Sequence, residues 1–184
     1  MPSLNKPTLL LFALLCLNPV SANARVLEQS AAGFVIEIAA EADQPVAASY
    51  QQFLRVGEWW DGQHSWFGNA DNFYIEPRAG GCFCEVDGDQ QVQHMRVVYV
   101  EPNKEIRMLG GLGPLQMMAV HGAMSWTFTS GQDGQTLILH RYAVSGYHKD
   151  GLDKLAAIVD QVQSAQVERL VHRLANTSLK QADQ

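Results

Sequence analysis

Hydrophobic and polar residues alternate along most of the middle of the chain, and this period of two predicts β-strands. One strand is expected early, over 33–39, and six more follow it, separated by turns rich in Gly, Asp, Asn and Pro. These six ranges are 72–76, 82–87, 92–101, 105–109, 123–129 and 136–147. Because short turns join consecutive strands, we expect an antiparallel sheet.

Two segments show helical spacing instead. Asp43 can cap a first helix, Pro45 is tolerated in its first turn, and Gly57 ends it. In the last segment, over 152–176, apolar residues recur every three or four positions, which predicts a helix about 37 Å long. A sheet with one apolar face needs a cover, and we expect this helix to supply it.

The segment 1–24 has the pattern of a cleavable secretory signal peptide: Lys6, an apolar run over 9–17 and an Ala-Asn-Ala ending at Ala24. The apolar run is shorter than the ~20 residues that span a bilayer. A retained anchor and a lipoprotein signal at Cys16 are the alternatives, but Leu15 is larger than the residue such signals place there. We expect cleavage after Ala24 and a periplasmic or secreted product with no membrane span.

Composition and charge then exclude several classes. The chain is 47% hydrophobic and 17% charged, unlike a disordered or collagen-like chain. Lys6 is the one charged residue of the leader, so the net charge of −6 for the full chain becomes −7 after cleavage. This acidic balance argues against nucleic-acid partners. Without repeats or linkers, we expect one domain over 25–176 and a disordered tail over 177–184.

Several stretches in this order resemble the START-like (SRPBCC) superfamily, in the branch of heat-shock-chaperone ATPase activators and polyketide cyclases. They are Phe34-Val-Ile-Glu-Ile38, Glu58-Trp-Trp-Asp61, 76–85, 97–102 and the last helix. The resemblance implies an α+β helix-grip fold, in which a curved antiparallel sheet of six to seven strands wraps around a long C-terminal helix, with short helices after the first strand. It also implies a cavity for apolar ligands between sheet and helix.

Cys82 and Cys84 share one face of their predicted strand, with Cα atoms about 6.6 Å apart. That geometry favours two buried free thiols, because a disulfide needs its Cβ atoms closer. A bulge after Gly80-Gly81 would permit a strained disulfide, and the oxidising setting outside the cytoplasm favours one. A metal site is the third alternative.

Aromatic and polar residues supply the candidate ligand contacts. The tryptophan pair Trp59 and Trp60 can form an aromatic rim at the cavity mouth or a plug of the core, or one tryptophan can serve each purpose. The loop over 110–118, with Met117 and Met118, is interpreted as a flexible lip over the cavity. The predicted ligand-binding set is Trp60, His94, Met117, Trp126, His140, Tyr142, Gln163 and Gln166.

The resemblance places His140 and Tyr142 on the cavity face of the last strand, although both faces of that strand are apolar. The two side chains can act as a general acid or base, or they can satisfy each other in the core. Gln163 and Gln166 fall within the apolar stripe of the last helix. They can contact a ligand, the sheet backbone or a buried water.

Three functions fit these observations. The first, which we favour, is an exported protein that holds a small apolar or amphipathic molecule. The second is a cyclase-like enzyme acting on a ketide-like substrate, with His140, Tyr142 and Arg96 as nominated groups. The third is a co-chaperone, which the leader disfavours because its cytosolic partner would not be met. The histidine spacing predicts no metal site, and no motif predicts a cofactor.

Overall fold

The computed structural model describes the backbone over residues 23–182 and the side chains up to residue 177. Eight strands form one antiparallel sheet in the order β1-β2-β8-β7-β6-β5-β4-β3. The strands are β1 (Asn23–Ser30), β2 (Gly33–Ala42), β3 (Phe73–Ile75), β4 (Cys82–Asp87), β5 (Gln90–Glu101), β6 (Glu105–Leu109), β7 (Val120–Ser130) and β8 (Thr136–Gly146). The expected fold class, an α+β helix-grip architecture, is confirmed.

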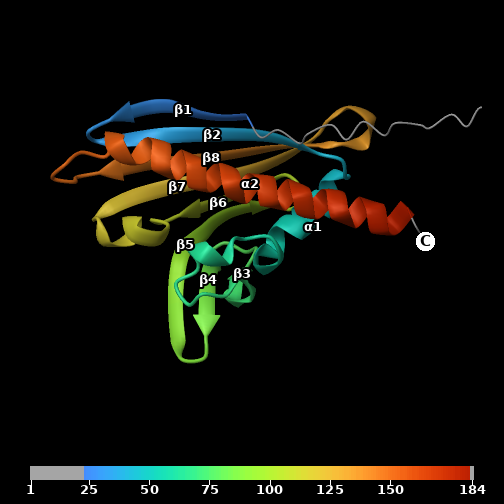
Figure 1. Ribbon diagram of the computed structural model, residues 1–184, viewed down its shortest axis with the longest axis horizontal. Helices are drawn as coiled ribbons and strands as arrows, with labels where there is room; N and C mark the ends of the chain where they lie inside the picture. Colours follow the sequence, from blue (N-terminus) through green and yellow to red (C-terminus); the bar gives the residue numbers. More distant parts are fainter. Residues whose placement is uncertain (1–22, 183–184) are drawn as a thin grey trace, which may run out of the picture.

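Helix α2 (Asp153–Ala182) runs lengthwise along β1, β2 and β8, while β3, β4 and β5 bend away from it (Figure 1). Four helical elements connect β2 to β3 along the chain. They are helix α1 (Val46–Leu54) and three short 3-10 turns, η1 (Val56–Glu58), η2 (Gly62–His64) and η3 (Ala70–Asn72). Two more turns, η4 (Gly113–Met117) and η5 (Gln132–Gly134), join the later strands. The sheet thus packs against α2 near its β1 edge and curves away from α2 near its β3 edge.

The inward face of β8 follows the period of two. Ile138, His140, Tyr142 and Val144 are buried, whereas Leu137 and Leu139 are exposed. The alternation places His140 and Tyr142 inside, as expected from the resemblance. The facing stripe of α2, with Ala156, Val167 and Leu170, is buried against the sheet, as is Leu152 just before the helix.

Some boundaries differ from the sequence predictions. Strand β1 was not predicted, because Arg25, Glu28 and Gln29 interrupt its pattern and only two of its eight residues are even partly buried. The sheet therefore has eight strands, not six to seven. Helix α1 has Pro45 as its N-terminal cap residue, without a side-chain hydrogen bond, so the predicted cap by Asp43 is wrong.

The last helix also ends later than expected. Residues 177–182 belong to α2, whereas the sequence predicted an end near Asn176 and a disordered tail. No Gly or Pro stands after Asn176 to stop a helix, and Leu, Lys, Gln and Ala in this stretch are good helix formers.

Cys82 and Cys84 form a disulfide with Cα atoms 5.4 Å apart. The prediction of two free thiols is therefore wrong, and so is the metal alternative. The two Cα atoms are closer than the about 6.6 Å of a fully extended strand, so the geometry on which that prediction rested does not hold. An irregularity in the β4–β5 ladder lies beside the pair, between Phe83 and Cys84, with the extra residue on β5. It lies within the ladder and not after Gly80-Gly81, where a bulge was considered.

The predicted signal peptide lies outside the described residues except for its last two, Asn23 and Ala24, which begin β1. Over 23–182, no helix is both long and apolar enough to cross a membrane.

Candidate ligand pocket

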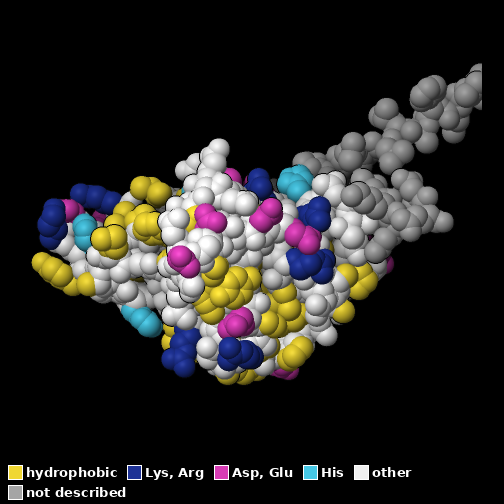
Figure 2. All heavy atoms as spheres, turned by 90° about the horizontal axis from the view of Figure 1, so that it is seen from below, with side chains coloured by type: hydrophobic (Ala, Val, Ile, Leu, Met, Phe, Trp, Pro, Cys, Tyr) yellow, Lys and Arg dark blue, Asp and Glu magenta, His cyan; other side chains and the backbone are white. Residues whose placement is uncertain are grey.

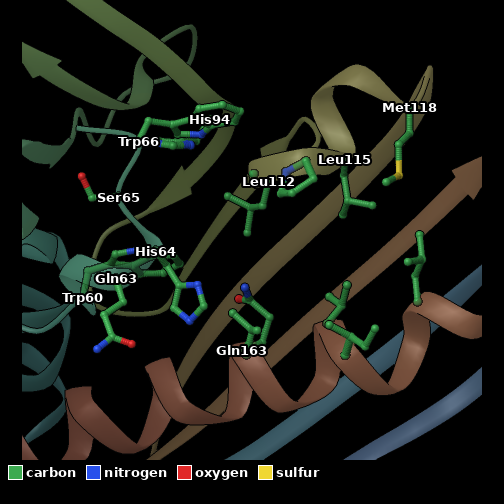
Figure 3. Close-up of a pocket in the computed structure, with 16 residues that line it drawn as sticks. Trp60, Gln63, His64, Ser65, Trp66, His94, Leu112, Leu115, Met118 and Gln163 are labelled. Atoms are coloured by element: carbon green, nitrogen blue, oxygen red, sulfur yellow. The ribbon is translucent and has the colours of Figure 1, made fainter. Parts of the chain in front are cut away.

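A pocket of about 560 Å³ lies between α2 and the part of the sheet that bends away from it (Figure 3). Its volume is within the range of small-molecule sites. One wall comes from α2, which contributes Leu155, Ile158, Val159, Val162 and Gln163. The opposite wall is the segment around η4, with Leu112, Gly113, Pro114, Leu115 and Met118. Most of the lining is therefore aliphatic.

Polar groups gather at one end of this pocket. The loop after α1 supplies Trp60, Gln63, His64, Ser65 and Trp66, and His94 comes from β5 (Figure 3). Trp66 is 47% exposed and stands at the rim. An apolar ligand with an oxygen at one end would match this division of the lining.

The segment around η4 is anchored from the sheet. The hydroxyl of Tyr142 donates to the carbonyl oxygen of Gly110 at 3.2 Å and accepts from the amide of Leu112 at 3.1 Å. Burial raises the pKa of Tyr142 to about 12, against the opposing effect of the Leu112 amide, so the phenol keeps its proton. The predicted lip is thus fastened at its first residues.

Three of the eight predicted ligand contacts line the pocket: Trp60, His94 and Gln163. Met117 is 86% exposed and turned away, and its neighbour Met118 lines the wall instead. Trp126, His140 and Tyr142 are buried in the core beneath the pocket. The nominated Arg96 is exposed on β5 and is not part of the lining.

The two tryptophans divide the roles considered for them. Trp59 packs against Phe53 and Trp126, and its indole N–H donates to the carbonyl oxygen of Phe53 at 3.1 Å. It is a core residue. Trp60 lines the pocket, and its Nε1 is buried without a hydrogen-bond partner among the described residues.

The two glutamines of α2 also separate. Gln166 accepts from the amide of Asp61 at 2.9 Å and so ties α2 to the loop after α1. Gln163 accepts from Nε2 of His140 at 3.1 Å, and its own amide nitrogen makes no hydrogen bond within the described part of the chain. Gln163 therefore leaves at least one N–H donor for a ligand, whereas the Trp60 N–H is buried away from the pocket space.

His94 enters the pocket because of a bulge. Phe83 pairs with Met95 and Cys84 pairs with Gln93, so His94 is the extra residue on β5. Both His94 and Met95 are buried, which strict alternation would not allow. Since sequence patterns do not locate bulges, the inward turn of His94 beside Met95 could not be read from the sequence.

Glu85 was missed as a functional residue. Its carboxylate is buried next to His94, 3.2 Å from the ring Nε2. The signal was present in the sequence, because Glu85 follows Phe83 by two positions in a strand and must share its inward face. An acidic residue at a core position is rarely without a purpose.

Figure 2 shows one face of the molecule, with charged side chains of both signs. Among the described residues on that face, Lys and Arg are scattered between Asp and Glu instead of forming a continuous basic stripe (Figure 2). Nucleic-acid-binding surfaces need such a stripe. Hydrophobic side chains gather near the centre of this face (Figure 2).

No protein-family model and no curated protein matches the chain. Solved structures do match. MLL2253 from Mesorhizobium loti has a TM-score of 0.53 at 16% identity, covering 78% of this chain and 97% of that one. Ara h 8.0201 has a TM-score of 0.52 at 12% identity, covering 77% of this chain and 97% of that one.

DynU16, from the dynemicin biosynthetic locus, has a TM-score of 0.52 at 17% identity. The match covers 77% of this chain and 47% of that one. At such identities the likeness concerns the fold, which agrees with the order of the strands and the long helix across them. The chain therefore shares its helix-grip fold with these proteins.

Proposed function

We propose that this protein is an exported ligand-binding protein that holds a small apolar or amphipathic molecule between α2 and the sheet. The observation that carries this proposal is the pocket of about 560 Å³, with aliphatic walls and polar groups at one end. Such a lining binds by burial of apolar surface and orients the ligand by a few hydrogen bonds. The leader sequence supports export.

Binding can be tested with N-phenyl-1-naphthylamine, a neutral probe whose fluorescence rises in apolar surroundings. We expect saturable binding to the purified protein. Val162→Trp fills the pocket from α2 and should weaken binding at least tenfold, whereas Ala157→Trp adds the same side chain at an exposed position of the same helix. Equal binding by both variants would overturn the assignment of this pocket.

Export is tested separately. After expression of the full-length chain in a bacterium, the protein should be recovered from the periplasm or the medium with the mass of residues 25–184. A full-length cytoplasmic product would contradict this part of the proposal. Native mass spectrometry of the same material would reveal a co-purifying apolar ligand.

A cyclase-like enzyme is the second candidate, and the Glu85–His94 pair favours it. A buried carboxylate that orients an imidazole in a ligand pocket is an arrangement suited to general-base catalysis. Native mass spectrometry also separates the two functions. A ketide-like ligand recovered with the mass of one water lost, or with the same mass but a changed chromatographic retention time, supports an enzyme. A ligand recovered with both properties unchanged supports a carrier.

A further inference from the structure

Glu85 and His94 lie side by side at the polar end of the pocket. Glu85 is 0% exposed, His94 is 3% exposed, and Oε2 of Glu85 is 3.2 Å from Nε2 of His94. The imidazole stacks on Phe73, with ring centroids 5.0 Å apart and an interplanar angle of 21°. Phe83 packs against it as well. The ring is therefore held in one orientation.

The carboxylate of Glu85 also accepts hydrogen bonds from the loop that lines the pocket. The Ser65 hydroxyl donates to it, as do the amides of Trp66 at 3.0 Å and Phe67 at 2.9 Å. Burial alone raises the pKa of a carboxyl group, but these hydrogen bonds and that of His94 together hold the pKa of Glu85 below its usual value. Glu85 is ionised and can only accept hydrogen bonds.

This fixes the tautomer of His94. Since the carboxylate accepts, Nε2 carries the hydrogen. Burial lowers the pKa of His94 despite the neighbouring carboxylate, so the ring is neutral at neutral pH and Nδ1 keeps a lone pair. Over the described residues, Nδ1 has no hydrogen-bond partner, although the ring lines the pocket.

The unpaired groups of the pocket are thus of two kinds. His94 offers an acceptor at Nδ1, and Gln163 offers an N–H donor. A ligand that pairs with both groups must both donate and accept hydrogen bonds. A hydroxyl group does both, whereas an ether or an ionised carboxylate only accepts.

We propose that the pocket recognises an apolar molecule by a hydroxyl group, phenolic or alcoholic, that donates to Nδ1 of His94. This inference rests on the proposed ligand-binding function and names the chemical class of its ligand. An ionised carboxylate has no proton to give and adds negative charge close to Glu85, so fatty-acid-like anions bind less well. Glu85 is a positioning residue, acting through His94.

Three probes with one aromatic body test the proposal: 2-naphthol, 2-methoxynaphthalene and 2-naphthoate, titrated into the purified protein at neutral pH by calorimetry. We expect 2-naphthol to bind about fivefold more tightly than 2-methoxynaphthalene, the effect of one hydrogen bond of about 1 kcal/mol. 2-Naphthoate should bind most weakly.

Two variants separate hydrogen bonding from shape. His94→Phe keeps a ring to pack on Phe73 and should bind the naphthol and the ether equally. In Glu85→Gln, the amide oxygen can keep the Ser65 and Phe67 hydrogen bonds and turn its NH₂ towards Nε2 of His94, which moves the ring hydrogen to Nδ1. The naphthol preference should then disappear. Glu168→Gln, at an exposed position of α2, makes the same chemical change away from the pocket and should keep the preference.

The outcomes are distinguishable. If wild-type protein binds the naphthol and the ether with equal affinity, the hydroxyl proposal is overturned and the ligand-binding function stands. If none of the three probes binds, both fail. Loss of the naphthol preference in Glu85→Gln, with the ether bound at least as tightly as by wild type because Nδ1–H can donate to it, supports the proposal without relying on the folding of His94→Phe.

Discussion

Nε2 of His140 donates to Oε1 of Gln163 at 3.1 Å, joining the last strand of the sheet to the long helix beneath the pocket. The imidazole also stacks on Trp126, with centroids 4.2 Å apart. His140 is therefore a structural group that orients Gln163, and through it one wall of the pocket. His140 occupies the oxygen of Gln163, so the groups that Gln163 leaves unpaired in the pocket lining are its N–H groups.

This relationship predicts acid sensitivity. Burial lowers the pKa of His140 to about 4, with hydrogen bonding in opposition, against 6.5 in the unfolded chain. The unfolded state therefore binds the proton more readily, so stability is complete above pH 6.5 and falls as pH drops towards 4. The loss amounts to about 3 kcal/mol.

Urea titrations at pH 7, 5.5 and 4.5 check this. His140→Phe keeps the stacking on Trp126 and should show a distinctly shallower fall in unfolding free energy over this range. His172→Leu, which removes an exposed histidine of α2, should retain the wild-type slope. An unchanged slope in His140→Phe would contradict the assignment.

Tyr142→Phe should loosen the wall around η4. The change removes the hydroxyl that bonds both Gly110 and Leu112, at a cost of about 1–3 kcal/mol because two backbone groups lose their partner. Urea denaturation measures the cost, and hydrogen exchange should be faster at the Leu112 amide. Tyr147→Phe, at a residue 80% exposed, serves as the control and should change neither quantity.

Gly122→Ala adds only one methyl group, yet we expect it to destabilise the protein strongly. A Cβ at Gly122 would lie 2.2 Å from the carbonyl oxygen of Gly110 and 2.7 Å from the hydroxyl of Tyr142. Backbone would have to move, and we expect a loss of about 2 kcal/mol or more together with weaker probe binding. Gly131→Ala meets only ordinary contacts of 3.4 Å or more and should be nearly neutral. Similar urea midpoints for the two variants would refute the argument.

The Cys82–Cys84 disulfide should contribute little stability despite being covalent. It closes a loop of only three residues, for which the chain-entropy model gives about 1.6 kcal/mol. Reduction should therefore lower the free energy of unfolding by about 1–2 kcal/mol without unfolding the protein at room temperature. The Cys82→Ala, Cys84→Ala double variant should be insensitive to reductant. A loss above about 4 kcal/mol on reduction would show that the bond does more than restrain the unfolded chain.

The strands were predictable where the alternation of residues is regular. Cys82–Asp87 and Glu105–Leu109 have the predicted bounds, and Asp153 begins α2 one residue from the predicted start. Burial of one face imposes a period of two on the sequence, so such segments can be identified locally. Strand β1 lies at the edge of the sheet and most of its residues are exposed, so its sequence does not show the period of two.

The site was less predictable, because it depends on contacts between distant segments. Gln163 was identified as a polar residue within the apolar stripe of the last helix, and Trp60 and His94 were also among the predicted ligand contacts. Gln63, His64 and Ser65 reach the pocket from a loop, and nothing local distinguishes them from ordinary turn residues. His140 and Tyr142 were correctly placed on the inward face of β8. They lie in the core instead of the pocket lining, and this depends on packing between segments that are distant in the sequence.

The bulge at His94 makes the pocket sensitive to the length of β5 as well as to its composition. Deleting Gln93 would let the β4–β5 ladder close regularly, with His94 opposite Cys84 and the pairs on either side unchanged. The imidazole would then point to solvent, and Glu85 would remain inside without it. A relative with this fold but an uninterrupted β4–β5 pairing would need a different polar group at this position, so insertions and deletions here can change ligand preference as effectively as substitutions.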